Sequence, residues 1–181
     1  MRILLLTALL TLSLFADIKQ EIFELYQNKE YKDVCNIGFK NFSKYSKDEE
    51  YISLYAFACL KVDYIDRLSV PITILKLSPQ SRANAAYFSI ILMQKKLLYH
   101  ALLDNYDISS LNLPTTDYIL SKIFDFYTKL EKKEQKEFYI FQDENDAQIK
   151  YKLYILKDAK IDKIVIEEFH NSISVRKHIY W

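Results

Sequence analysis

Histidine is the side chain best suited to acid–base or metal chemistry near neutral pH, and this chain has three: His100, His170 and His178. Their separation along the chain is far from the spacing of a metal-ligand motif. His170 and His178 can approach each other across a hairpin centred near Ser172 and Ile173, but two imidazoles alone make a weak site. We therefore expect each histidine to be a surface or structural residue, and we predict no metal site.

Carboxylates are the other candidates for chemistry. The acidic segment from Asp143 to Asp146 lacks the spacing and the glycine of a calcium-binding loop, so we interpret it as a polar turn. The pairs Glu49-Glu50 and Glu167-Glu168 are expected on solvated faces. The sequence has no glycine-rich phosphate loop, no nucleophile-elbow motif and no Cys/His couple with an orienting partner. We predict no catalytic residue, no cofactor and no enzymatic activity.

The chain has two cysteines, Cys35 and Cys59. In an exported protein such a pair is interpreted first as a disulfide. If one helix ends near Tyr45 and the next begins near Asp48, both cysteines lie about twelve residues from the turn and at the same height on antiparallel neighbours. We predict a Cys35–Cys59 disulfide, and two buried free thiols are the alternative.

The first sixteen residues have the pattern of a secretory signal peptide. Arg2 is a short positive region, Ile3–Phe15 is an apolar run, and Ala16 is a small residue at the cleavage point. An uncleaved membrane anchor is the alternative, but the run is shorter than the roughly 20 residues that span a bilayer. We predict cleavage after residue 16, no stable transmembrane span after that cleavage, and a periplasmic location, with secretion as the alternative.

Composition indicates a helix-rich, folded chain. Half of the residues are hydrophobic and 15% are aromatic, which is enough apolar surface for a sizeable core. One glycine and three prolines favour helices over a loop-rich sandwich. Lys and Arg number 25 against 24 Asp and Glu, and this balance argues against a nucleic-acid binder.

Apolar spacing predicts helices through the first three quarters of the chain, arranged mostly in pairs. Pro71 falls inside one of them and predicts a kink near Ser69, because an interior proline removes a hydrogen bond. The last helix is expected to cap the helical array. The expected helices cover residues 18–28, 30–45, 49–62, 64–77, 81–96, 98–106 and 117–137.

Three tyrosines recur with a nearly constant period. Tyr31, Tyr64 and Tyr99 lie 33 and 35 residues apart, and Pro79 and Pro114 each follow fifteen residues after the second and third. Over residues 17–114 this pattern resembles tetratricopeptide-type repeats, whose unit is a helical hairpin of about 34 residues. An irregular helical bundle is the alternative. The sequence departs from the family at positions where small residues are preferred, namely Ile22, Tyr55, Ile90, Val34, Arg67 and Leu102.

The resemblance implies that the first helix of each pair lines a concave groove, which in the family holds a peptide. The abundance of tyrosine fits an interaction surface, because tyrosine combines apolar area with a polar end. The alternative is that these side chains belong to an ordinary core. The candidate partner-binding residues are Phe23, Tyr26, Ile52, Tyr87, Phe88, Ile91 and Gln94.

The period changes from helix to strand after residue 137. Short runs rich in Ile, Val, Tyr and Phe, at residues 138–142, 149–157, 161–169 and 173–180, are separated by turn residues. They predict a four-strand antiparallel meander with one packed and one wet face. No turn here contains glycine, so Asn and Asp are expected wherever φ is positive.

The predicted fold class is α+β, with a helical domain at residues 17–137 and a β-meander at residues 138–181. The expected function is that of an exported adaptor or assembly factor. It would bind a protein partner in the cell envelope through the helical concave face or the sheet edge. The alternative is a small envelope hydrolase or ligand-binding protein with a pocket between helices and sheet. Oligomeric state is left open.

Overall fold

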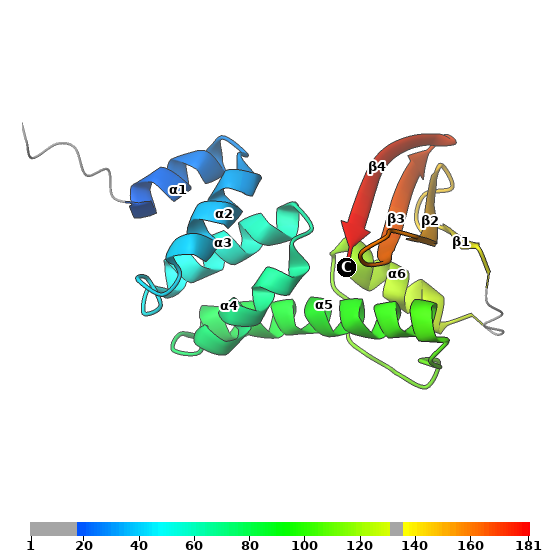
Figure 1. Ribbon diagram of the computed structural model, residues 1–181, viewed down its shortest axis with the longest axis horizontal. Helices are drawn as coiled ribbons and strands as arrows, with labels where there is room; N and C mark the ends of the chain where they lie inside the picture. Colours follow the sequence, from blue (N-terminus) through cyan, green and yellow to red (C-terminus); the bar gives the residue numbers. More distant parts are fainter. Residues whose placement is uncertain (1–17, 131–135) are drawn as a thin grey trace, which may run out of the picture. The chain divides into compact units, whose positions relative to one another are not determined.

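The computed structural model describes residues 18–130 and 136–181, so the predicted signal peptide lies outside the described residues. The chain divides into two compact units, one ending at Val62 and the other beginning at Asp63. Helices precede a C-terminal four-stranded antiparallel sheet, which confirms the α+β class (Figure 1). Within the two described ranges, no helix combines the length and apolar character needed to cross a membrane.

The first unit consists of three helices: α1 (Ile18–Gln27), α2 (Tyr31–Asn41) and α3 (Glu49–Lys61). The turn between α1 and α2 uses a positive φ of 64° at Lys29. Asp48 caps α3, because its Oδ1 accepts a hydrogen bond from the Tyr51 N–H at 3.0 Å. Helix α3 contacts both α1 and α2, so the three helices share one core.

The only glycine of the chain, Gly38, allows α2 and α3 to approach closely. A Cβ at residue 38 would lie 2.3 Å from the Cβ of Tyr55, a distance that real atoms do not reach. The glycine leaves the space that the Tyr55 side chain of the facing helix occupies, and Tyr55 is fully buried against it.

The predicted disulfide is confirmed: Cys35 on α2 is bonded to Cys59 on α3. Their Cα atoms are 4.7 Å apart, and both residues are completely buried. The bridge therefore crosses the same helix–helix contact that Gly38 makes possible. The part of the chain that the structure describes contains no free cysteine.

The second unit begins with a 3-10 turn, η1 (Ile65–Leu68), followed by α4 (Ser69–Ile74), α5 (Pro79–Asp104) and α6 (Ile119–Thr128). The predicted helical pair at residues 81–96 and 98–106 is wrong, because α5 is one continuous helix of 26 residues. Neither glycine nor proline occurs after Pro79 in this helix, and the residues around Leu97 are good helix formers.

Two prolines have roles different from those predicted. Pro79 begins α5 directly after the cap residue Ser78, whose Oγ accepts from the Ser81 N–H at 3.0 Å. It therefore opens a helix and does not close a hairpin. Pro71 is the third residue of α4, within the first turn, where proline is tolerated. The backbone changes there from 3-10 to α-helix at Ser69, the place where a kink was predicted.

The sheet confirms the predicted meander. Its strands are β1 (Phe138–Gln142), β2 (Ile149–Leu156), β3 (Lys163–His170) and β4 (Ile173–Tyr180), in the order β1-β2-β3-β4 with antiparallel neighbours. The β3–β4 turn has positive φ at Asn171 (48°) and Ser172 (68°), so serine shares a role that was expected of Asn and Asp.

One face of the sheet is packed and the other is open. On the inner face, Tyr139 and Phe141 contact α6 through Tyr127 and Phe126, with ring centroids 5.2 and 5.7 Å apart. The cross-strand register places Leu153, Ile166 and their neighbours on the same face, and these are buried. The end of the β3–β4 hairpin projects away from α5 and α6 (Figure 1).

Candidate functional site

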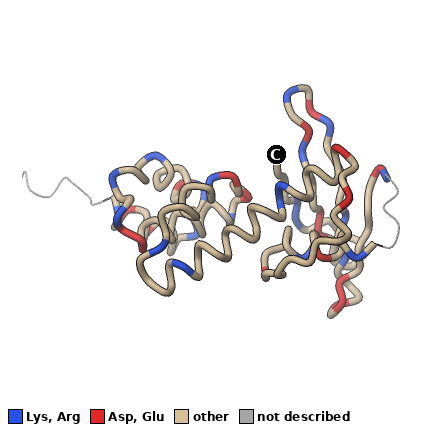
Figure 2. The backbone as a smooth tube through the Cα atoms, turned by 90° about the horizontal axis from the view of Figure 1, so that it is seen from below, with Lys and Arg blue, Asp and Glu red and all other residues tan. Residues whose placement is uncertain are grey.

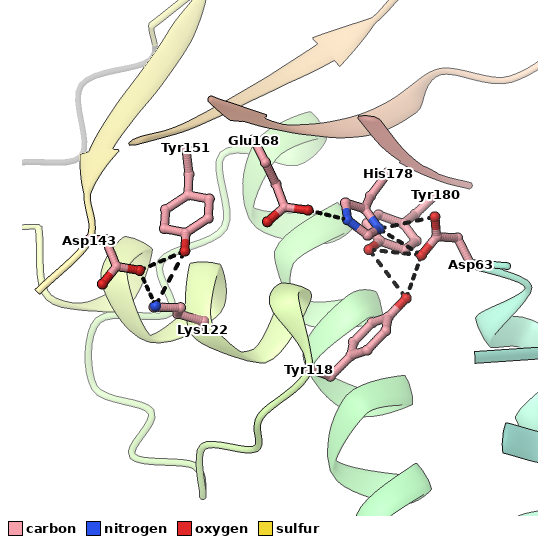
Figure 3. A network of polar contacts seen from close by, with 8 residues as sticks. All are labelled: Asp63, Tyr118, Lys122, Asp143, Tyr151, Glu168, His178 and Tyr180. Carbon is pink, nitrogen blue, oxygen red and sulfur yellow. Dashed lines mark hydrogen bonds and ion pairs between the residues drawn. The ribbon is translucent and has the colours of Figure 1, made fainter. Parts of the chain in front are cut away.

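The most connected polar group of the second unit is centred on His178, on the inner face of β4. This imidazole is only 3% exposed. Its Nδ1 lies 2.9 and 3.0 Å from the two carboxylate oxygens of Asp63, and its Nε2 lies 2.9 Å from Oε1 of Glu168 (Figure 3). Asp63 follows α3 with a φ of 65°, and Glu168 is on the neighbouring strand β3. The ring therefore lies between two carboxylates.

These contacts determine the charge of the imidazole. Burial by itself lowers the pKa of His178, but the hydrogen bonds to Asp63 and Glu168 outweigh it and raise the pKa above the ordinary 6.5. The same hydrogen bond from His178 lowers the pKa of Glu168. The raised pKa favours the imidazolium form, in which each ring nitrogen donates an N–H to a carboxylate.

Two tyrosines complete the group. The Tyr118 hydroxyl donates to Oδ1 of Asp63 at 2.6 Å, and the Tyr180 hydroxyl lies 3.4 Å from the same oxygen (Figure 3). Burial, together with the charge of Asp63, raises the pKa of Tyr118 well above its usual range. Both phenols remain protonated and act as hydrogen-bond donors.

This arrangement is suited to holding structure. A general base needs a free imidazole nitrogen, and both nitrogens of His178 are occupied. Both cysteines of the chain are in the disulfide of the other unit. Among the described residues, no group of three His, Cys, Asp or Glu side chains is placed to hold a metal ion.

The sequence interpretation missed this group. His170 and His178 do not face each other, because His170 pairs with Ile173 and His178 pairs with Ile166 in the β3–β4 register. The prediction that Glu167 and Glu168 form a solvated face is wrong: Glu167 is buried beside Ser174 and Lys177, and Glu168 binds His178. Asp63 gave no signal in the sequence, since its partners are more than fifty residues away.

A second polar group joins α6 to the β1–β2 hairpin. Asp143 is buried directly after β1, and its Oδ2 accepts from Lys122 of α6 and from the Tyr151 hydroxyl, the latter at 2.6 Å (Figure 3). The hydrogen bonds from Lys122 and Tyr151 hold the pKa of Asp143 well below its usual range. The predicted polar turn is present, but its first carboxylate, Asp143, is buried and binds the turn to α6 through Lys122.

A cavity of about 320 Å³ lies in the second unit, beside Tyr180 at the C-terminal end of β4. Its most unusual lining residue is Lys95, which is only 2% exposed. Lys95 Nζ is 2.7 Å from Oδ2 of Asp66 and also donates to the main-chain oxygen of Trp181. Burial lowers the pKa of Lys95, although Asp66 opposes this effect. The cavity is lined by Asp63, Tyr64, Ile65, Asp66, Arg67, Lys95, Tyr180 and Trp181.

Four of the predicted groove residues are core residues in the structure. Ile52 is buried in the first unit, and Phe88, Ile91 and Gln94 are buried along α5. Gln94 Nε2 donates to the main-chain oxygen of Pro114 at 3.0 Å. These four side chains therefore do not line an open groove. They belong to the core, as the alternative interpretation of the sequence stated.

The other three predicted residues remain at least partly accessible. Phe23 is exposed, and it lines a cavity of about 410 Å³ with Lys19 and Leu54 in the first unit. Tyr26 packs edge-on against Tyr31 at 5.1 Å. In the second unit, the Tyr87 hydroxyl donates to Asp117 at 2.7 Å. The structure thus distributes the predicted set over both units and brings no more than part of it to a surface.

Exposed apolar side chains gather on the side of the sheet opposite α6. We call this the outer sheet face and define it by the exposed Phe138, Ile140, Leu156 and Ile179, the half-buried Tyr154 and the buried Val165. The register aligns Phe138, Tyr154, Val165 and Ile179 in one row across all four strands. Lys152 borders the row, with its Nζ 4.4 Å from the ring centroid of Phe138. Figure 2 shows basic and acidic residues interspersed along the chain.

Searches among protein families, curated proteins and solved structures found no match to this chain.

Proposed function

We propose that this chain is an exported, non-enzymatic adaptor or assembly factor that binds a protein partner of the cell envelope through its outer sheet face. The observation that carries this proposal is the set of exposed apolar side chains on that face. Phe138, Leu156 and Ile179 are exposed there, on three different strands. A soluble domain rarely exposes a contiguous apolar surface unless something binds it.

Other features support the same proposal. The Cys35–Cys59 bridge fits an oxidising compartment, as export requires. His178 is held by carboxylates on both of its nitrogens, so the best candidate for catalysis in the second unit has a structural role. In the first unit, α3 packs on both helices of the α1–α2 hairpin, as the third helix of a tetratricopeptide-like array would. We include that likeness in the proposal for the first unit alone.

The test is site-specific photocross-linking of the full chain in the cells that produce it. A photoreactive phenylalanine analogue replaces Leu156 on the outer sheet face or Met93 on α5, and these two side chains are equally exposed, at 44%. We expect irradiation to give one heterologous protein adduct from residue 156 and none from residue 93. The same adducts from both positions, or none from residue 156, would contradict the proposal.

A small envelope hydrolase or ligand-binding protein is the second candidate. The cavity of about 320 Å³ beside Lys95 favours it, because the cavity combines aromatic walls with a nearly buried amine. Native mass spectrometry of protein purified without added ligand separates the two candidates. A small molecule that stays bound to the wild-type chain and is lost from Tyr64→Ala would support the second candidate.

A further inference from the structure

We propose that β1 is a self-pairing edge, at which two copies of this chain join their sheets into one antiparallel sheet of eight strands. The occupant is therefore a second copy, with β1 of each copy running antiparallel to the other. The backbone geometry and the charge of the two edge strands, β1 and β4, favour this pairing. It is independent of the proposed function, which concerns a different protein on the outer sheet face.

The backbone of β1 directs groups away from β2 that have no backbone partner within residues 18–130 and 136–181. At the end of the strand, the Asp143 N–H donates to the Ile149 main-chain oxygen at 3.0 Å. Antiparallel ladders exchange hydrogen bonds at every second residue, so Phe141 and Tyr139 make the preceding bonds to β2. The N–H and C=O groups of Phe138, Ile140 and Gln142 therefore point to the free edge.

These outward groups are self-complementary about Ile140. A two-fold axis through this residue pairs Ile140 with Ile140 of the second copy, and Phe138 with Gln142 of the second copy. Each of these pairs exchanges two backbone hydrogen bonds. On the inner face, Tyr139 then lies opposite Phe141 of the second copy, an aromatic pair of the kind that stabilises neighbouring strands. The contact is isologous, so it closes at two copies.

The charges of the sheet favour this edge over β4. Strand β1 contains no charged residue, no proline and no irregularity in its register. The nearest cation of the row is Lys152 on β2, and the two copies of β2 would be three strand spacings apart, about 14 Å. That separation exceeds the Debye length of about 8 Å at physiological salt, so their repulsion is screened.

Strand β4, in contrast, is protected against self-pairing. Its register shifts between Glu168 and Phe169, which leaves Val175 without a partner on β3 and bends the edge. Arg176 and Lys177 follow at the centre of the strand. Self-pairing of its regular part, residues 176–180, would bring Lys177 of the two copies within about one Debye length of each other. Bulges and basic residues are the usual means of blocking an edge strand, and β1 has neither.

The experiment is disulfide trapping in the full chain. In a hydrogen-bonded antiparallel pair the Cα atoms are about 5.5 Å apart, which is within the range of a disulfide. Ile140→Cys places the two thiols on the axis, whereas Phe138→Cys places them about four residues apart along the strands, roughly 14 Å. Both side chains are exposed, at 53% and 43%, and both flank the same edge.

We expect Ile140→Cys to form a disulfide-linked dimer on mild oxidation and Phe138→Cys to stay monomeric. Light scattering of the wild-type chain should show a dimer, and Ile140→Pro should be a monomer. The proline removes an N–H that faces the free edge and no bond to β2, so the circular dichroism of the monomer should be unchanged. A monomeric wild type at every soluble concentration would overturn the proposal, as would equal cross-linking of the two cysteine variants. A dimer without any adduct from residue 156 would leave this inference standing and refute the proposed function.

Discussion

The protonation of His178 is linked to the stability of the second unit. Its pKa is raised above the ordinary 6.5 by Asp63 and Glu168, so its stabilisation is fully present below about pH 6.5. That stabilisation is lost as the pH rises through the folded-state pKa. Glu168 behaves oppositely: its pKa is lowered, so its contribution is present above about pH 4.5 and is lost at more acid pH.

We predict that His178→Gln lowers the free energy of unfolding of the second unit by about 1–3 kcal/mol near pH 6, because glutamine leaves one partly buried carboxylate without a charged donor. The difference from wild type should shrink as the pH rises above the raised pKa. Urea titrations followed by fluorescence measure this effect, since Trp181 is the only tryptophan and belongs to the same unit.

The matched control is His170→Gln, which changes an exposed histidine at the end of β3. Its stability should stay within about 0.5 kcal/mol of wild type at every pH, as is usual for surface substitutions. Parallel pH profiles for wild type and His178→Gln would contradict the assigned role of this imidazole.

Asp143 offers a second prediction at the residue scale. Asp143→Asn should lower the free energy of unfolding by about 1–2 kcal/mol, because Lys122 loses a charge-assisted hydrogen bond. The loss is modest because the Lys122 side chain is about one-third exposed, so water screens its charge. Asp146→Asn is the control, as this neighbouring turn carboxylate is partly exposed and its Oδ1 accepts a hydrogen bond from the Gln148 N–H, a bond that an amide oxygen can also accept. Equal losses in the two variants, measured by thermal unfolding, would show that the turn and not the ion pair matters.

Among the helices, the close contact between α2 and α3 depends on the absence of a side chain at Gly38. Gly38→Ala would place a Cβ 2.3 Å from the Cβ of Tyr55, so the helices must separate. We expect a net loss of about 1–3 kcal/mol from overpacking, even though alanine is the better helix former. Thermal unfolding followed by circular dichroism measures it. Lys32→Ala, at an exposed position of the same helix, is the control and should change little. A stabilised Gly38→Ala variant would mean that the contact is looser than the structure indicates.

The same elements show what a sequence predicts well. The strands of the meander were predicted to within a few residues, because alternation and turn residues are local signals. The Cys35–Cys59 bridge was predicted because helix length sets the height of each residue. The predicted end of one helix and start of the next near Leu97 came from the repeat period and is wrong. Neither glycine nor proline occurs there to end α5.

The candidate sites were harder to predict, for a physical reason. The helical period identifies the apolar face of α5 but does not say whether that face borders a groove or a core, and Phe88 and Ile91 proved to be core. The Asp63–His178 contact joins residues 115 apart in the chain. Such a contact follows from the tertiary fold and from no spacing within one element. The outer sheet face was predicted only as a wet face, since strand alternation does not show which exposed residues are apolar.

At the scale of the whole molecule, export and the disulfide make one joint prediction. The bridge closes a loop between residues 24 positions apart, and on the chain-entropy model it stabilises the folded state by about 3–4 kcal/mol. It should form only where the compartment is oxidising. We therefore expect protein recovered from the cell envelope to begin near Asp17 and to take up no alkylating agent until it is reduced and unfolded, after which two thiols react. A variant that lacks residues 1–16 should stay in the cytosol, react at two thiols once unfolded without reductant, and melt at a lower temperature. An intact Met1 on the envelope protein would contradict cleavage. Two free thiols on the same protein would contradict the disulfide. Mass spectrometry of one sample therefore tests cleavage and the disulfide separately.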